Sequence, residues 1–261
     1  MTRIPDSHPR KKSLESRQKI VDGSSMGLLA DSAMIAHGRG EAFDYLLGER
    51  TTESAREAIR ESATRLRNAR SPVISVNGNT VVLAGDGAIR LAAVLDCPIE
   101  VNLYYRTPRR VEGLISLLEE WRSNVSKEDA PDGFDGDWKD SVEGVTLLGD
   151  SPNFKIEGLE GPRSNCTVEG IGGADTILVP LEDGDRCEAL ISLGKEVIVV
   201  DLNPLSRSSR MATVTIVDEV SRAFEVILSY LLNDSNYRQK EWDNRKSLKE
   251  SLKEIGEHFS E

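Results

Sequence analysis

The sequence is short of the residues that mark export, redox chemistry and metal binding. Its 261 residues include three cysteines and three histidines. Cys97, Cys166 and Cys187 lie far apart, and none has the spacing of a metal site or of a C-x-x-C redox motif. We therefore expect free thiols in a reducing cytoplasm and no disulfide framework.

Long apolar runs and an excess of positive charge are missing as well. No run of eighteen apolar residues occurs and the N-terminus has no apolar signal-peptide core, so neither a membrane partner nor export is expected. The net charge of −11 argues against nucleic-acid binding, because phosphate backbones require a basic face. The P-loop, G-x-S-x-G and H-E-x-x-H motifs are absent too.

What the chain does contain is an alternation of short β-branched runs with helical patterns. Strands are predicted over 72–76, 99–104, 145–148, 175–180, 197–200 and 213–217. Helices are predicted over 86–96, 108–122, 186–193 and 220–232. Uninterrupted apolar runs are typical of strands covered on both faces of a parallel sheet. We predict one α/β domain over 1–261 with a Rossmann-like, doubly wound, mainly parallel sheet.

Helical segments precede and follow this alternation. The N-terminal segment, 1–70, contains one helical pattern over 14–29 and another that begins at Thr51 or Thr52. The C-terminal segment, about 238–261, has apolar side chains at helical spacing up to Phe259. We expect it to be a helix docked on the body or on a second subunit.

An acidic segment at about 123–140 interrupts the alternation. It is rich in Asp and Gly and poor in aliphatic residues, so it lacks the apolar content to fold by itself. We predict an exposed, mobile insertion that Phe134 and Trp138 pin to the body.

The stretch from Lys195 to Asp218 holds the strongest indication of a ligand site. Its buried strand ends at Asp201, and the Asn203-Pro204 bend then leads to Arg207 and its neighbouring serines. Ligands of open α/β sheets bind outside the carboxyl ends of the strands, and the arginine fork matches phosphate. Asp201 can accept a hydrogen bond from a ribose or a base. The alternative is an ordinary solvent-exposed polar loop.

Polar residues also follow three other predicted strands. Asn77, Gly78 and Asn79 form either a turn or a pair of amides offered to a ligand. Arg106 lies at a strand-to-helix corner. Glu182, Asp183 and Asp185 provide carboxylates that can bind Mg²⁺ through water or receive an ammonium group, while Asp185 is alternatively a helix cap.

His37-Gly38-Arg39-Gly40 precedes the first predicted strand. It is not a dinucleotide fingerprint, because no strand precedes it and Phe43 occupies the third glycine position. We predict a turn whose glycines allow the backbone close to a ligand, with His37 and Arg39 pointing outward. The alternative is a structural histidine.

Five irregular polar segments resemble the archaeal-type phosphopantothenate synthetases, also called 4-phosphopantoate–β-alanine ligases. The segments are I-P-D-S-H-P-R at 4–10, I-A-H-G-R-G-E-A-F-D-Y-L-L-G-E-R at 35–50, P-V-I-S-V-N-G-N at 72–79, V-P-L-E-D-G-D-R at 179–186 and D-L-N-P-L-S-R-S at 201–208. The resemblance implies a Rossmann-like homodimer that joins 4-phosphopantoate to β-alanine in coenzyme A biosynthesis. It also implies that ATP, with Mg²⁺, is converted to AMP and diphosphate.

The same resemblance implies a set of site residues. The ATP contacts are expected at Arg17, Arg39, Asp201, Leu202, Asn203, Arg207, Ser208, Glu219 and Val220. The family pattern has Asn-Ile where this chain has Glu219-Val220, so contact there is expected through the backbone. The acidic insertion is likewise a departure from the family, and we expect it to stay away from the chemistry.

The candidate roles follow from the chemistry of an acyl adenylate. Arg39 and Arg207 are candidates to hold charge that develops on phosphate, and His37 to accept the proton of the β-alanine ammonium group. Candidates for contact with the other substrates are Asn77, Gly78, Asn79, Arg106, Asp183 and Asp185. The alternative function is a non-catalytic nucleotide-binding regulatory module; a nicotinamide oxidoreductase is weaker, because its glycine fingerprint is missing.

Overall fold

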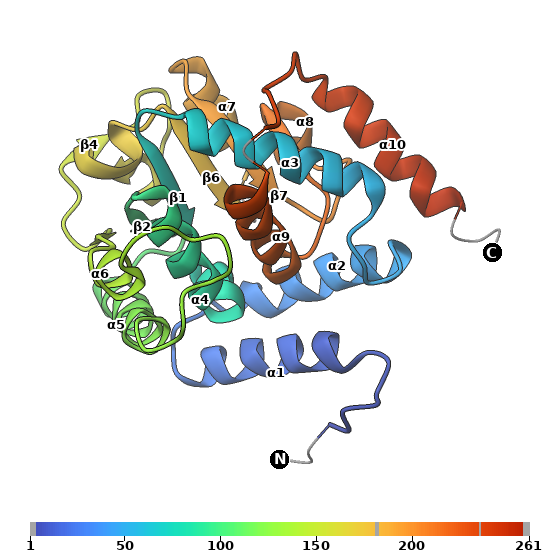
Figure 1. Ribbon diagram of the computed structural model, residues 1–261. Helices are drawn as coiled ribbons and strands as arrows, with labels where there is room; N and C mark the ends of the chain where they lie inside the picture. Colours follow the sequence, from blue (N-terminus) through green and yellow to red (C-terminus); the bar gives the residue numbers. More distant parts are fainter. Residues whose placement is uncertain (1–3, 181–182, 235, 258–261) are drawn as a thin grey trace.

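Six parallel strands form the central sheet in the computed structural model, which describes residues 4–180, 183–234 and 236–257 (Figure 1). The strands are β1 (Pro72–Val76), β2 (Ile99–Val101), β3 (Leu147–Leu148), β6 (Thr176–Pro180), β7 (Glu196–Val200) and β8 (Val214–Ile216). Their order in space is β3-β2-β1-β6-β7-β8. This is the order of a dinucleotide-binding fold, with the switch point between β1 and β6, so the predicted doubly wound sheet is confirmed.

Helices cover both faces of the sheet. One face carries α3 (Glu53–Asn68), α4 (Gly78–Leu95), α5 (Pro108–Val125) and α9 (Val220–Asn233). The other carries α7 (Gly184–Ser192), α8 (Arg207–Met211) and the connection from β3 to β6. Within β7, Ile198 and Val200 face the first layer while Val197 and Val199 face the second. Both faces are therefore buried, which is why the strands read as uninterrupted apolar runs.

The connection from β3 to β6 is irregular and contains four short elements. They are β4 (Phe154–Lys155), the 3₁₀ turn η1 (Pro162–Ser164), β5 (Asn165–Cys166) and the π-helical turn η2 (Val168–Gly172). β4 and β5 pair antiparallel.

Helix α4 lies at the centre of the first layer. By length and composition it is the one helix of the described residues that reaches the threshold for a membrane span, but 67% of it is buried inside the fold. It connects β1 to β2 and packs against α5 and α9 (Figure 1). Its apolar composition is therefore that of a core helix.

Two N-terminal helices lie across the carboxyl ends of the strands. They are α1 (Lys11–Ser25) and α2 (Ser32–Leu46), and Figure 1 shows them one above the other at the foot of the body. Lys19 donates to the Leu83 carbonyl at 3.1 Å, and Asn79 donates to the Ala33 carbonyl at 3.1 Å. These contacts hold the two helices over α4.

The turn predicted at 37–40 is wrong, because α2 runs through it without a break. Each interior glycine costs a helix about 1 kcal/mol relative to alanine. The docked part of α2 offsets that cost: Leu47 and Phe43 pack with Leu202 and Val217, and the buried Asp44 forms an ion pair with α9. Tertiary packing of this kind supplies most helical stability in proteins.

Two helix starts also differ from expectation. Asn77 caps α4, because its side chain accepts from the Thr80 amide at 3.1 Å, so 77–79 open a helix rather than make a tight bend. Asp183, not Asp185, caps α7 and accepts from the Arg186 amide at 2.9 Å. The predicted cap at Thr52 of α3 is confirmed.

The acidic segment is attached as predicted. Helix α5 extends to Val125, and α6 (Trp138–Glu143) follows a loop. Trp138 is buried, donates to the Val125 carbonyl at 3.2 Å and meets the Phe134 ring edge-on at 5.1 Å. This pair pins the segment beside α5.

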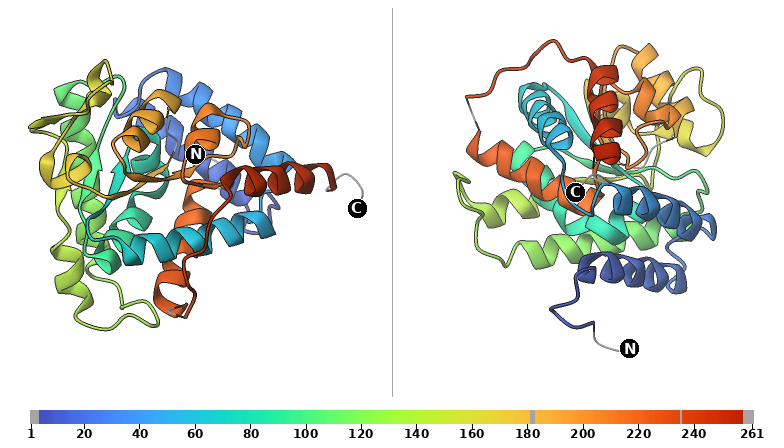
Figure 2. Two further views of the ribbon diagram at one scale, coloured as in Figure 1. Left: turned by 90° about the horizontal axis from the view of Figure 1, so that it is seen from above. Right: turned by 90° about the vertical axis from the view of Figure 1, so that its right-hand side faces the viewer.

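The C-terminal helix packs on the body. Helix α10 (Asn244–Glu257) lies beside α3 (Figure 2), where the Ser251 and Ser54 hydroxyls are 2.9 Å apart and Glu254 accepts from the Ser54 amide at 2.9 Å. Phe259, the last apolar residue of the predicted helix, lies outside the described residues.

Candidate active site

A cavity of about 780 Å³ lies between the two N-terminal helices and the carboxyl edge of the sheet. Its wall includes residues that follow β1, β2, β7 and β8, and it therefore extends across the switch point. Binding sites of doubly wound sheets lie at this place. The volume suits ligands of nucleotide size.

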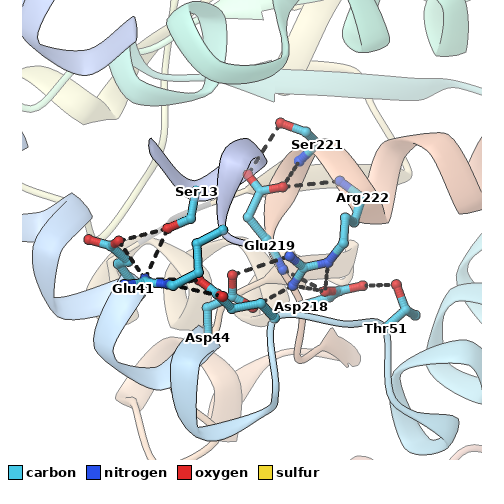
Figure 3. A network of polar contacts seen from close by, with 10 residues as sticks. Ser13, Glu41, Asp44, Thr51, Asp218, Glu219, Ser221 and Arg222 are labelled. Atoms are coloured by element: carbon cyan, nitrogen blue, oxygen red, sulfur yellow. Dashed lines mark hydrogen bonds and ion pairs between the residues drawn. The ribbon is translucent and has the colours of Figure 1, made fainter. Parts of the chain in front are cut away.

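One end of the cavity, below β8, holds a buried ion triad (Figure 3). Arg222 of α9 forms ion pairs with Asp44 of α2 and with Asp218, whose oxygen is 2.7 Å away. Thr51 donates to Asp218 at 2.6 Å. Burial raises the pKa of both carboxyl groups, although Arg222 acts against it. The triad fixes α2 and the α9 start relative to the sheet.

Glu41 of α2 joins the first two helices at the rim of the cavity. It accepts from Ser13 of α1 at 2.7 Å (Figure 3). It also accepts from Arg17 of α1 at 2.7 Å and from Arg10 at 3.1 Å. Burial acts to raise the pKa of Glu41, but the hydrogen bonds from Ser13 and Arg17 and the nearby positive charges lower it overall. Glu41 is therefore a carboxylate that holds α1 in place.

His37 lies in the wall of the cavity on α2. Its Nε2 atom is buried and has no hydrogen-bond partner among the described residues. Burial lowers the pKa of His37 below its usual 6.5, and the charges of Glu41 and Glu219 act only partly against this. At neutral pH the imidazole is therefore uncharged and able to accept a proton.

The opposite end of the cavity, near β1 and β2, is lined by two arginines that the sequence did not single out. Arg163 is buried, and its Nη1 donates to Asp183 at 2.7 Å. Burial lowers the pKa of Arg163 to about 10. Arg110 of α5 donates through Nε to the Leu28 carbonyl at 3.2 Å. The only indication for Arg163 in the sequence was its place in the long Gly-rich connection to β6.

The structure brings one group of the predicted residues to the cavity. The group that lines it is His37, Asn77, Gly78, Asn79, Leu202, Glu219 and Val220. The side chain of Glu219 caps α9 and accepts from the Ser221 and Arg222 amides at 2.9 and 3.1 Å. Leu202 follows β7, and Glu219 and Val220 follow β8 at the start of α9.

A second group of predicted residues lies around the end of β7 and is not among the described residues that line the cavity. Asp201 accepts from the Asn203 amide at 2.9 Å and from the Ser206 hydroxyl. Arg39 is exposed on α2, and its charge acts to lower the pKa of Asp201, although burial raises it overall. Ser208 is buried in the first turn of α8.

The remaining predicted residues are also not among the described residues that line the cavity. Each of them contacts another part of the protein. Arg207 forms exposed ion pairs with Asp185 and Glu188 of α7. Arg106 donates to the Gly149 carbonyl and fixes the loop after β3. Arg17 binds Glu41, as described above.

The two described carboxylates that follow β6, Asp183 and Asp185, form ion pairs. Asp183 binds Arg163 and Asp185 binds Arg207, while Glu182 lies outside the described residues. Within the part of the chain that the structure describes, no group of three or more His, Cys, Asp or Glu side chains is arranged to hold a metal ion. Asp183 and Asp185, two of the three carboxylates predicted to bind Mg²⁺, are thus each paired with an arginine, and the prediction of an Mg²⁺ site stays a prediction.

Comparison with known proteins gives one consistent result. A family model described as phosphopantothenate/pantothenate synthetase matches residues 54–258. The 4-phosphopantoate–β-alanine ligase of Thermococcus onnurineus (strain NA1) is 42% identical over 267 residues, which cover 100% of this chain and 95% of that protein. Ligases of the same name from Methanosarcina mazei and Methanospirillum hungatei JF-1 are 42% and 45% identical, covering 99% and 87% of this chain and 96% and 84% of their own.

Proposed function

The chain belongs to the phosphopantothenate/pantothenate synthetase family, and from that membership we propose that it is an ATP-dependent ligase that joins 4-phosphopantoate to β-alanine. The observation that carries the proposal is the match, over nearly the whole chain, to relatives that bear this activity in their names. The cavity at the switch point is the place for the reaction. The product, 4′-phosphopantothenate, places the enzyme in coenzyme A biosynthesis, and we propose that it acts in the cytoplasm.

The proposed reaction has two steps. A carboxylate oxygen of 4-phosphopantoate attacks the α-phosphorus of ATP, which forms an acyl adenylate and releases diphosphate. The β-alanine amine then attacks the acyl carbon, the amide bond forms and AMP leaves. The task of the protein is to hold three substrates in line and to neutralise charge that develops on phosphate.

His37 is the proposed acceptor of the proton that β-alanine loses. An ammonium group is not a nucleophile, so the amine must be deprotonated before the second step. His37 is uncharged, lines the cavity and has an unpartnered Nε2 among the described residues. These are the properties of a general base.

The nucleotide is proposed to bind at the β7 and β8 end of the cavity. Leu202, Glu219 and Val220 line this end, and Arg39 and Asp201 lie beside it. Since the Glu219 carboxylate is engaged in capping α9, contact at 219–220 is through the backbone. Arg207 is proposed to exchange its exposed carboxylate partners for phosphate, which solvent screening of those pairs makes possible.

Mg²⁺ is proposed to enter with ATP, as the partner of its phosphates. This ion usually keeps several waters and binds through substrate phosphates rather than through an all-protein cage. This coordination preference is compatible with the ion pairs that Asp183 and Asp185 form with arginines.

A homodimer is proposed to form through the outer face of α2. This face carries exposed Met34, Ile35 and Tyr45, with the small residues Gly38 and Ala42 between them. A Cβ atom added to Gly38 would meet nothing within 4 Å in the described chain. Small residues allow a second helix to approach closely, and a second copy of α2 is the proposed partner.

The decisive experiment is to supply ATP, Mg²⁺, 4-phosphopantoate and β-alanine to the purified protein. The expected products are AMP, diphosphate and 4′-phosphopantothenate. In addition, labelled diphosphate is expected to exchange into ATP only when 4-phosphopantoate is present. ADP as the product would exclude the adenylate route, and ATP binding without any turnover would favour the regulatory module.

A further inference from the structure

The C-terminal helix α10 contacts the body along one face. Asn244, Leu248 and Ser251 lie on this face, at the spacing of successive helical turns. The hydroxyls of Ser251 and Ser54 are 2.9 Å apart, and Leu248 is buried beside Leu202. Because Leu202 follows β7 and lines the cavity, α10 packs against an element of the proposed nucleotide end.

Asn244, in the first turn of α10, joins the edge of the sheet to α8. Its Oδ1 accepts from the Thr215 amide of β8 at 2.8 Å. Its Nδ2 donates to the Ser209 and Ala212 carbonyls at 2.7 and 3.1 Å. β8 is the last strand in the order of the sheet, so Asn244 occupies a hydrogen-bonding position on an open edge. A side-chain amide has both donor and acceptor groups, and Asn244 uses both at once.

Helix α8 depends on contacts of this kind because it is only five residues long. The last carbonyls of a helix have no donor within it, and a helix of this length is not stable by itself. The Thr215 hydroxyl donates to the same Ser209 carbonyl at 2.8 Å. Asn244 and Thr215 therefore together satisfy the carbonyl end of α8 and fix its position on β8.

Ser209 connects this contact to the loop that follows β7. It is fully buried, and its hydroxyl donates to the Asn203 carbonyl at 2.8 Å. Its amide donates to the Ser206 hydroxyl at 3.0 Å, and Ser206 in turn donates to Asp201. Since Asp201 and Asn203 are expected nucleotide contacts, a continuous set of hydrogen bonds runs from Asn244 to residues expected to bind ATP.

We propose that Asn244 is a positioning residue for ATP, which holds α8 and the loop after β7 in the conformation that receives the nucleotide. This inference rests on the nucleotide site of the proposed function. Arg207 and Ser208, both expected ATP contacts, begin α8, so a shift of this short helix on β8 displaces them together. Misplacement by about 1 Å already impairs substrate positioning in enzymes. Asn244 acts through these residues, because it is not among the described residues that line the cavity.

The test compares the three substrate KM values in Asn244→Ala. The KM for ATP is expected to rise roughly 5- to 30-fold, because hydrogen bonds that hold α8 are lost, while the other two stay within about twofold. The matched control is Ser251→Ala, which removes a buried hydrogen bond from the same face of α10 but one that leads to α3. It is expected to leave the KM for ATP unchanged. An unchanged KM for ATP in Asn244→Ala, or an equal rise in all three KM values or in the control, would overturn the inference.

Thr215→Val is a second test, which decides the matter if Asn244→Ala fails to fold. Valine resembles threonine in shape and suits a strand, but it lacks the hydroxyl that donates to the Ser209 carbonyl. The KM for ATP is expected to rise in the same direction, by roughly two- to tenfold. An unchanged KM for ATP in this variant would contradict the positioning of α8 through its carbonyl end.

Calorimetry with Mg²⁺ and ATP alone separates this inference from the ligase function. The dissociation constant for ATP is expected to be roughly 5- to 30-fold higher in Asn244→Ala than in the unaltered protein. Equal affinities would refute the positioning role even if turnover is normal. Conversely, unaltered protein that binds ATP more tightly than the variant but forms no AMP would refute the ligase function and leave the positioning role intact. Absence of ATP binding in both proteins would refute both.

Discussion

At the scale of single residues, His37 shows how the fold changes the pKa of a side chain. Its imidazole is kept uncharged by burial, and it faces the cavity with a ring nitrogen that no described residue binds. The position of His37 therefore says more about the chemistry of the site than do Gly38 and Arg39, although the sequence motif indicated all three residues equally.

We predict that His37→Gln lowers the rate of amide formation by about 10²–10⁴-fold, because a general base contributes an effect of this size. In the unaltered enzyme the rate is expected to fall as the pH drops through the pKa of His37, which lies below 6.5, since protonated imidazole cannot accept a proton. Measurement of kcat against pH checks both statements.

Diphosphate–ATP exchange is the control for His37, because the first step does not need this base. Exchange is expected to survive in His37→Gln. Loss of exchange together with amide formation would show that the histidine positions the nucleotide instead.

Arg207 tests the nucleotide end at the same scale. We predict that Arg207→Ala lowers AMP formation by about 10²-fold, as loss of one donor to a developing charge typically does. The melting temperature is expected to change little, because the ion pairs of Arg207 are exposed. Arg210→Ala, an exposed arginine on the same helix, is the matched control. A large fall in stability with normal turnover would make Arg207 structural.

At the scale of elements, Glu41 receives most of the side-chain hydrogen bonds that attach α1 to α2, while Arg10 also pairs with Glu49 just beyond α2. Arg10, Ser13 and Arg17 of the N-terminal segment all bind Glu41. Because α1 and α2 cover the cavity, the charge of Glu41 contributes to the position of this cover. Arg17 is also an expected ATP contact, so we expect nucleotide binding and the attachment of α1 to share this residue.

We predict that Glu41→Gln speeds amide hydrogen exchange in residues 11–25 by roughly two- to fivefold, which corresponds to the loss of about 0.5–1 kcal/mol for a partly exposed network. In the unaltered protein the contribution is present above the usual pKa of 4.5 and is lost as the pH falls through the lowered pKa of folded Glu41. Glu15→Gln is the control, because its ion pair with Lys11 stays within α1. Unchanged exchange in Glu41→Gln would contradict the prediction.

The acidic segment at about 123–140 is attached to the body at the side of the first helical layer. Trp138 and Phe134 attach it beside α5. Among the described residues, none from 123–140 lines the cavity. The segment is therefore peripheral to the cavity, in keeping with its composition.

At the scale of the whole molecule, the outer face of α2 is where we propose that two copies of the chain meet. Ile35 is 67% exposed on this face, although the rest of α2 is docked over the cavity. Exposed apolar side chains gathered on one helix indicate a contact surface. A dimer formed there places Arg39, at the border of the same face, close to the partner subunit.

We predict that Ile35→Glu converts a dimer into a monomer of 28.7 kDa, because it buries a charge at the centre of the proposed contact. Sedimentation velocity measures the mass directly. Leu193→Glu, also an exposed apolar position but at the end of α7, is the control and is expected to leave the dimer intact. A monomeric unaltered protein would contradict the proposed homodimer.

The sequence by itself determined the sheet, because burial on both faces leaves a local signature in runs such as Val197–Val200. It also indicated the attachment of the acidic segment, since two aromatics in a polar stretch have few alternatives to burial. Its long polar motifs identified the family for the same reason: irregular residues at fixed spacing rarely recur by chance. The helix cap at Thr52 and the alternation of strands and helices could likewise be predicted from local sequence alone.

Only the tertiary structure decided which polar residues meet. Asp44 and Arg222 are 178 residues apart, and no local pattern couples them. Two glycines argue against a helix at 37–40. The helix forms there nevertheless, because its other face packs on side chains that are distant in the sequence. Arg163 lines the cavity because Glu100 and Asn102 form hydrogen bonds with the connection from β3 to β6, which the sequence predicts to be a loop. Contacts between distant segments cost loop-closure entropy and are encoded by shape and charge complementarity, which a single sequence does not display.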